Sequence, residues 1–270
     1  LELRDLQLDA GQAASWATAE GAGGSPGEAF ISQLLPEIVL HENQHYLMYD
    51  DGTPFFWLAD TQWDIVHKAT REHVDMVLED RAAKGFTAIK VPMMFHWSTN
   101  DPNIYGELPG QPGDWNEAYW EHVDYIIDGM IERGIHPVIL PAWGNLSGGD
   151  NNYFTPEEAR AYGEWLAARF ADRDGIIYVV GGDRTEARDC CGIVEAIALG
   201  LKNSDPQRLV SFHSFYQSRY ESHADATWLD FSGFQTGHYT CDYNGEFSKI
   251  KSYINNDWNT APTRPIVNME

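Results

Sequence analysis

Apolar runs alternate with amphipathic helical patterns along most of the chain. Seven runs of five to eight residues consist mainly of apolar side chains, and about 40 residues separate the start of one from the next in much of the sequence. Short buried strands separated by helices are typical of a parallel sheet with crossover helices. The predicted strands are Phe55–Ala59, Ala88–Met94, His136–Trp143, Ile176–Val180, Leu209–His213, Phe231–Gln235 and Pro265–Met269.

The helical segments between these runs carry start and stop signals. Thr70 stands as the N-cap of one helix, and Gly85 ends it. Thr155, Pro156 and Glu158 predict a capping box with proline at the first helical position. The other helices are predicted at 116–134, at 195–205 and, with a weaker pattern, at 245–254.

This order of elements favours an α/β fold, a (β/α)8 TIM barrel that is incomplete at the C-terminus, with seven strands present. A doubly wound sheet is less favoured, because "LADTQWD" follows the first strand where a glycine-rich phosphate turn would stand. The segment before that strand predicts an N-terminal β-hairpin with a turn at Asp50–Gly52.

The domain organisation follows from composition. Residues 1–35 include a stretch rich in Gly, Ala and Ser, and are interpreted as a leader, a linker or the end of a preceding domain. Residues 36–270 form the barrel, with the eighth strand missing. The chain begins at Leu1 and stops at Glu270 directly after an apolar run, so we expect a fragment or a processed chain.

Charge excludes some partners. The 41 acidic residues against 18 basic ones give a net charge of −23, which argues against nucleic acid or an anionic membrane as the main partner. No apolar run is long enough to span a membrane. The three cysteines lack zinc-site spacing, and are either free thiols or include one disulfide from Cys241 to Cys190 or Cys191.

Candidate chemistry gathers where the predicted strands end, and in a barrel these ends converge on one face. Asp183 and Glu270 follow strands four and seven, which suits a carboxylate pair flanking one glycosidic bond. The 10 tryptophans suit stacking on sugar rings. The full set is Asp60, Trp63, Asp64, His96, Trp97, Trp143, Gly144, Asn145, Asp183, Arg184, His213, Gln235, His238 and Glu270.

Several long segments resemble the DUF4038 or apiosidase-like glycoside hydrolases, glycoside hydrolase family 140. The similarity runs in order from about Pro36 to Glu270, and its most specific segments are "DGTPFFWLADTQWDIVHKATREHVDMVLEDRAAKGFTAIKV", "YWEHVDYIIDGMIERGIHPVILPAWG", "FTPEEARAYGEWLAARFADRDGIIYVVGGDR" and "WLDFSGFQTGH". The resemblance implies a retaining double displacement with Asp183 as acid/base and Glu270 as nucleophile. It also implies an eighth strand, and often a small β-sandwich domain, after that glutamate. The family's known activity removes apiose-capped side chains from pectin.

The substrate-binding candidates each have an alternative. Asp60 either binds sugar hydroxyls or bonds local amides in its loop. Trp63, Trp97 and Trp143 either pack in the core or at the rim or stack on sugar rings, and of the three Trp143 is favoured as the substrate-facing indole. His213 and His238 either donate to substrate or lie behind the residues that do. Since a cation beside Asp183 would lower the pKa that a general acid needs raised, we expect Arg184 to point elsewhere. The candidates are Asp60, Trp63, Trp143, Arg184, His213, Gln235 and His238.

Two rival functions stay open. A metal-dependent hydrolase would use His213 and His238 as ligands, but no third soft ligand is evident. A non-catalytic carbohydrate-binding barrel would bind glycan without turnover. The main prediction is a polysaccharide-degrading glycosidase that needs no cofactor, has an oligo- or polysaccharide as partner, and works outside the cell or in the periplasm.

Overall fold

The structure is a computed structural model that describes residues 2–3, 16–17, 35–95, 99–143, 153–184, 192–214, 224–235 and 248–269. The chain divides into two compact units, 1–32 and 33–270. In the first unit, the described residues form a two-stranded antiparallel pair, β1 (Glu2–Leu3) with β2 (Trp16–Ala17). All remaining elements belong to the second unit.

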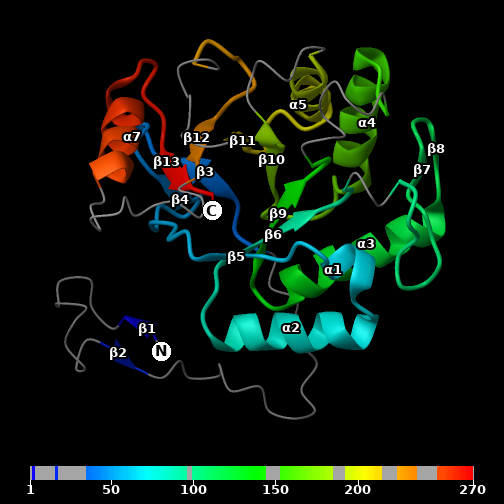
Figure 1. The fold of residues 1–270 in the computed structure, drawn as a ribbon. Coiled ribbons are helices and arrows are strands. Elements are labelled where there is room, and N and C mark those ends of the chain that lie inside the picture. The colour runs from blue at the N-terminus through cyan, green and yellow to red at the C-terminus, as the bar shows by residue number, and fades with distance from the viewer. Residues whose placement is uncertain are drawn as a thin grey trace. The chain divides into compact units, whose positions relative to one another are not determined.

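A seven-stranded parallel sheet is the centre of the second unit (Figure 1). Its strands lie side by side in chain order, with β5 and β13 at the two edges. This order is that of a β/α barrel opened between its first and seventh strands, so the predicted incomplete barrel is confirmed. The strands are β5 (Ala59–Thr61), β6 (Ala88–Pro92), β9 (His136–Leu140), β10 (Ile177–Arg184), β11 (Val210–Ser214), β12 (Phe231–Phe234) and β13 (Ile266–Asn268).

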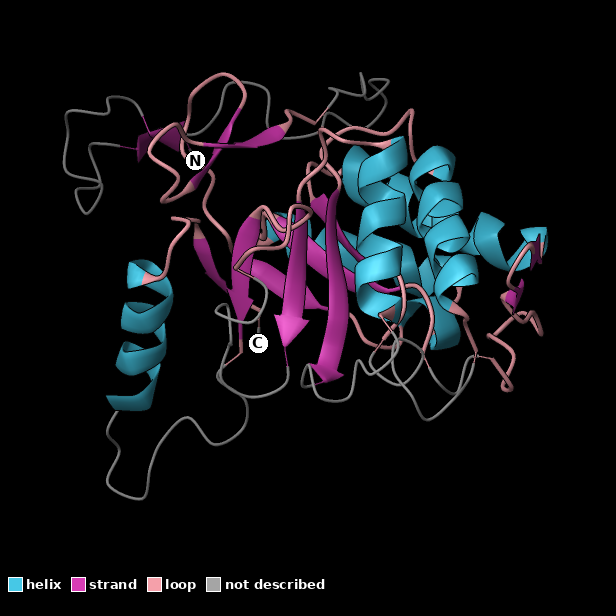
Figure 2. Ribbon diagram, turned by 90° about the horizontal axis from the view of Figure 1, so that it is seen from above, coloured by secondary structure: helices cyan, strands magenta, loops and turns pink. Residues whose placement is uncertain are grey.

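Described helices connect the successive strands from β5 to β11 and connect β12 to β13, and they pack on the outside of the sheet, as the view from above also shows (Figure 2). Helix α7 lies at the β13 end, whereas α4 and α5 lie beside the central strands (Figure 1). The described helices are α1 (Ile65–Lys68), α2 (Arg71–Ala83), α3 (Glu117–Glu132), α4 (Pro156–Arg169), α5 (Ile193–Ser204) and α7 (Ser248–Asn259).

The predicted helix starts are confirmed at α2 and α4. The Thr70 side chain accepts from the N–H of His73 at 3.4 Å. Thr155 Oγ1 accepts from the N–H of Glu158 at 3.2 Å, and the Glu158 carboxylate accepts from the N–H of Thr155 at 2.8 Å, which completes the capping box. Helix α7 begins and ends later than the predicted 245–254.

Two apolar clusters divide the fold into an inner and an outer layer. Alternate strand residues point to opposite faces, so Ile89 and Val91 pack against the helices while Ala88 packs inside the barrel. The hairpin of β3 (Ile38–Leu40) and β4 (Leu47–Tyr49) adds Ile38 and Leu47 to the inner cluster. The predicted N-terminal hairpin is therefore confirmed, and it packs on the barrel core.

The first barrel strand differs from its prediction. It spans 59–61 rather than 55–59, because the preceding residues serve the hairpin instead. The N–H of Phe55 donates to the carbonyl of Leu47 at 3.1 Å, and Pro54 bridges to Met48. Phe56 is 73% exposed, so its apolar side chain does not belong to a buried strand.

Candidate active site

The strand β10 contains a bulge at its carboxyl end. Gly181 pairs with His213 of β11, and the next pair is Arg184 with Ser214. Two residues of β10, Gly182 and Asp183, thus have no partner in the β11 register. Bulges re-aim side chains and are common beside active sites, and this one lies where the loops of a barrel converge.

Both residues before Asp183 are glycines for two reasons. Neighbouring atoms lie close to their Cα atoms, and their backbone φ angles are positive. Gly181 has φ 91°, and a Cβ there would lie 2.8 Å from the carbonyl oxygen of His213. Gly182 has φ 114°, and a Cβ there would lie 2.7 Å from Trp143 ring carbons Cδ2 and Cζ3. At both positions, a residue larger than glycine is therefore disfavoured, because its Cβ would lie too close to neighbouring atoms and because its backbone φ is positive.

Aromatic rings form one wall beside the bulge. Trp143, which follows β9, packs against Gly182 and makes edge contacts with Trp63 at 4.5 Å and with the His213 ring at 5.1 Å between centroids. Trp143 is 8% exposed, whereas Trp63 is half-buried. Phe95 completes the group at 5.8 Å from Trp63. Most of the Trp143 surface therefore contacts protein.

A buried lysine, which the sequence-based reasoning missed, lies inside the barrel. Lys90 of β6 is 2% exposed, and its Nζ lies 3.2 Å from His213 Nδ1 and 5.3 Å from the centre of the Trp63 ring. The other ring nitrogen of His213, Nε2, lies 3.0 Å from Gln235 Oε1. The available signal was one charged residue within an otherwise apolar strand pattern.

The same lysine holds the end of the seventh strand. Lys90 Nζ donates to the carbonyl of Met269 at 2.7 Å, and the N–H of Met269 donates to the carbonyl of Phe234 at 2.6 Å. Both backbone groups of the residue before Glu270 are thus fixed. This lysine–carbonyl bond also links β6 to the end of β13 across the barrel interior.

Apart from Asp64, which precedes α1 and accepts from Lys68 Nζ at 2.9 Å, the predicted site residues divide into three groups. Trp63, Trp143, His213 and Gln235 come together around Lys90 and the β10 bulge. Asp60 lies apart, since it points to the helix side of β5 and accepts hydrogen bonds from Arg81 of α2 and from Gln62. Both partners are side chains, the guanidinium of Arg81 and the amide of Gln62, so the Asp60 carboxylate is held chiefly by helix α2 rather than by backbone amides of its own loop.

The third group consists of residues that are not among the described ones, and of residues of which only the backbone is described. It comprises Glu270, His238, His96, Trp97, Gly144 and Asn145, the three cysteines, and the side chains of Asp183 and Arg184, whose backbone belongs to β10. Their roles remain predictions.

Within the described part of the chain, we searched for a metal site and for a membrane-spanning helix. Its His, Cys, Asp and Glu side chains form no group of three that could hold a metal ion. Its helices include none that is long and apolar enough to cross a membrane.

Comparison with known proteins gives a family and a fold. Residues 41–270 match the family described as "Apiosidase-like, catalytic domain". A glycoside hydrolase family 5 structure from Bacteroides vulgatus superposes with a TM-score of 0.80 at 26% identity, covering 88% of this chain and 55% of that one. A family 5 mannosidase structure from Rhizomucor miehei shares the fold, with a TM-score of 0.60 at 14% identity over 87% of this chain and 72% of that one.

A curated sequence relative is also similar over part of the chain. The Arabidopsis thaliana protein named "Putative mannan endo-1,4-beta-mannosidase 4" is 25% identical over 150 residues, which are 55% of this chain and 33% of that protein. The chain therefore spans a third of this plant relative and about half of the Bacteroides structure.

Proposed function

The chain belongs to the apiosidase-like catalytic-domain family of glycoside hydrolases, and from this membership we propose that it is a retaining glycosidase acting on a polysaccharide outside the cell or in the periplasm. Asp183 is the acid/base and Glu270 the nucleophile. Glu270 attacks the anomeric carbon while Asp183 protonates the leaving oxygen, and Asp183 then removes a proton from the water that releases the sugar.

The observation that carries this proposal is the bulge in β10. A regular strand would turn successive side chains alternately inward and outward, whereas the two unpaired residues let the Asp183 position depart from that alternation. The close contact of Gly182 with Trp143 supports a fixed bulge rather than a loose one. Met269, anchored through both of its backbone groups, supports a similarly fixed start for the Glu270 position.

The buried network of Lys90, His213 and Gln235 in the barrel interior supports the same mechanism. A lysine that donates to the Met269 carbonyl carries its positive charge close to the backbone of the next residue. A nearby cation stabilises a carboxylate over its protonated form. This is the state that a nucleophile requires, whereas the acid/base must be protonated to begin the reaction.

Two substrate classes follow from the comparisons. Apiose-containing pectin side chains are favoured by the family, and β-mannan is favoured by the names of the plant and fungal relatives. Sugar release from rhamnogalacturonan-II and from β-mannan, measured for this chain, distinguishes the two substrate classes. Binding of either glycan without release would favour the non-catalytic alternative.

Two variants test the catalytic roles. Asp183→Ala should slow hydrolysis of substrates with poor leaving groups far more than hydrolysis of activated aryl glycosides, because only the former need protonation. Glu270→Gln should stop both, because no glycosyl–enzyme intermediate can form. Normal turnover by Glu270→Gln would refute the assignment.

A further inference from the structure

A cavity lies between α3, α4 and a short hairpin, and none of the residues that gather around Lys90 lines it. The hairpin consists of β7 (Gly110–Gln111) and β8 (Asp114–Trp115), joined by Pro112 and Gly113. The cavity has a volume of about 450 Å³, and its walls include Trp115, Trp165 and Tyr162 together with Asp114, Glu117 and Glu158. Glu117 and Glu158 lie in the first turns of α3 and α4, which follow the carboxyl ends of β6 and β9. The cavity is therefore on the same end of the barrel as the candidate active site.

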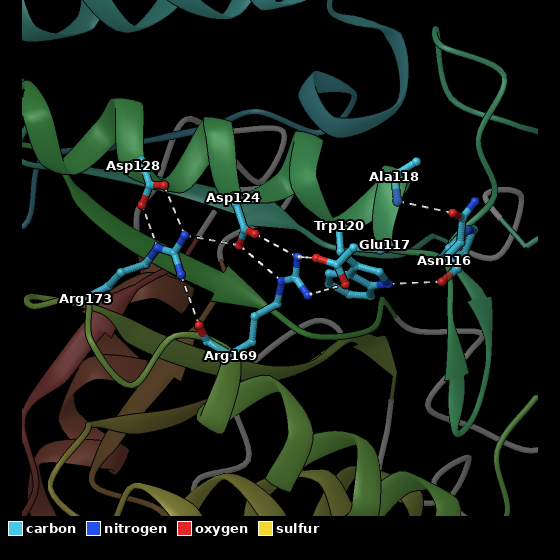
Figure 3. A network of polar contacts seen from close by, with 9 residues as sticks. Asn116, Glu117, Ala118, Trp120, Asp124, Asp128, Arg169 and Arg173 are labelled. Carbon is cyan, nitrogen blue, oxygen red and sulfur yellow. Dashed lines mark hydrogen bonds and ion pairs between the residues drawn. The ribbon is translucent and has the colours of Figure 1, made fainter.

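The wall of this cavity is held by ion pairs between α3 and α4 (Figure 3). The Arg169 guanidinium donates to both carboxylate oxygens of Glu117, at 3.1 and 2.6 Å, and to Asp124 at 3.1 and 2.7 Å. It also lies 5.4 Å from the centre of the Trp165 ring. One side chain thus fixes an acidic and an aromatic wall residue together. Arg173 continues the row by bonding Asp128 (Figure 3).

The aromatic walls support one another. The Trp115 and Trp165 rings lie 5.2 Å apart at 30°, and both are half-buried. Tyr162 lies beneath them and donates from its hydroxyl to the carbonyl of Pro141 at 2.8 Å. A rigid aromatic surface loses little conformational entropy when a ligand packs on it.

Several donors and acceptors at this surface have no hydrogen-bond partner within the described part of the chain. Among the described residues, the indole N–H groups of Trp115 and Trp165 donate no hydrogen bond and are not sealed from solvent. Glu158 uses one carboxylate oxygen for its capping box, which leaves Oε1 unbonded within the same part of the chain, and Asp114 presents an exposed carboxylate. Hydrogen bonds lower the pKa of Glu117 and of Glu158, from Arg169 and from the Thr155 N–H respectively, so both carboxylates are ionised acceptors near neutral pH.

We propose that this cavity is an ancillary binding site for an uncharged polysaccharide chain. Sugar hydroxyls both donate and accept, which matches carboxylates and indole N–H groups on one wall, and the C–H faces of pyranose rings pack on aromatic rings. A polyanion is disfavoured by the three carboxylates. A polycation would pair with the carboxylates, so the test below includes one as a separate probe. The proposed function supplies only the ligand class, since the cavity itself takes no part in bond cleavage.

The test fills the cavity without disturbing the core. Ala161 is an exposed residue of α4 that lines the cavity, and Ala168 is an exposed alanine of the same helix that does not. Ala161→Met should weaken binding of a soluble galactomannan about tenfold, equivalent to roughly 1.4 kcal/mol, whereas Ala168→Met should bind like the unmodified chain. Isothermal titration calorimetry measures both, and circular dichroism checks that each variant folds. The same titrations with polygalacturonate, a polyanion, and with polylysine, a polycation, test whether the cavity binds a charged polymer instead.

Each outcome decides the proposal. Equal galactomannan affinity in the two variants, or no galactomannan binding by the unmodified chain, overturns it. Polylysine binding that Ala161→Met abolishes, in the absence of glycan binding, also overturns it and assigns the cavity to a cation. Hydrolysis of a short soluble substrate should be the same in both variants. The loss of that hydrolysis in Asp183→Ala tests the proposed function separately, so either idea can fail while the other stands.

Discussion

Substitution of Gly182 by alanine tests whether the β10 bulge is fixed by its contact with Trp143. The added Cβ would lie 2.7 Å from two Trp143 ring carbons, whereas carbon atoms in ordinary contact are about 3.5–4.0 Å apart. The strand or the ring must therefore move by about 1 Å. Trp63 and His213 contact the same ring, so it has little room to move.

The expected cost has two parts. Overpacking in a core destabilises by about 1–3 kcal/mol. A non-glycine residue at φ 114° adds a backbone cost of about 1–3 kcal/mol. We expect Gly182→Ala to lower the free energy of unfolding by about 2–6 kcal/mol, a large part of the 5–15 kcal/mol that is typical of a folded domain.

Gly134→Ala is the matched control. Gly134 has φ 73°, and a Cβ there would meet nothing within 4 Å, so its substitution carries the backbone cost alone. Urea unfolding followed by circular dichroism gives both free energies. If Gly182→Ala loses no more stability than Gly134→Ala, the Trp143 contact does not fix the bulge. A double-mutant cycle with Trp143→Ala adds a check, because removing the ring should recover part of the Gly182→Ala loss.

Two further predictions concern buried polar groups. Lys90→Met should lower the free energy of unfolding by about 1–3 kcal/mol, because the buried Met269 carbonyl loses its donor. The control Lys68→Met replaces a 65% exposed side chain and should change the free energy of unfolding by less than about 0.5 kcal/mol. Equal urea midpoints for the two variants would contradict the prediction. Burial lowers the pKa of His136 below 6.5, so the unfolded chain takes up a proton that the folded protein excludes, and stability falls as pH drops through 6.5. His136→Gln should therefore show a smaller decrease in urea midpoint between about pH 7.5 and 5.5, and an unchanged pH dependence would refute this account.

The fold was predictable because its signals are local. The Thr155 capping box and the Thr70 N-cap follow from residues a few positions apart, and the seven strands follow from runs of apolar residues. The first strand was misplaced because Phe55 and Phe56 look like strand residues. Their neighbour Pro54 pairs with Met48 instead, and that long-range choice is not visible in the local pattern.

The site was predictable only in part. The strand ends correctly brought Trp63, Trp143, His213 and Gln235 to one region. Asp60 was harder, because a carboxylate near a strand end faces either the barrel or the helices, and the register that pairs it with Ile89 turns it toward Arg81. Lys90 was missed because its partners His213 and Met269 are 123 and 179 residues away.

The two proposed catalytic positions are supported by different physical devices, which suit different roles. Asp183 follows two glycines in a bulge, and the second of them, Gly182, packs against Trp143, whose ring also contacts the imidazole of His213. Met269, the residue before Glu270, is bonded to a buried lysine that is itself hydrogen-bonded to His213. A cation near a carboxyl group favours the ionised form of that group, and apolar surroundings favour the protonated form. A retaining glycosidase needs this difference between its two carboxyl groups, and we propose that Lys90, through Met269, and the Trp143 ring, through Gly182, contribute to it.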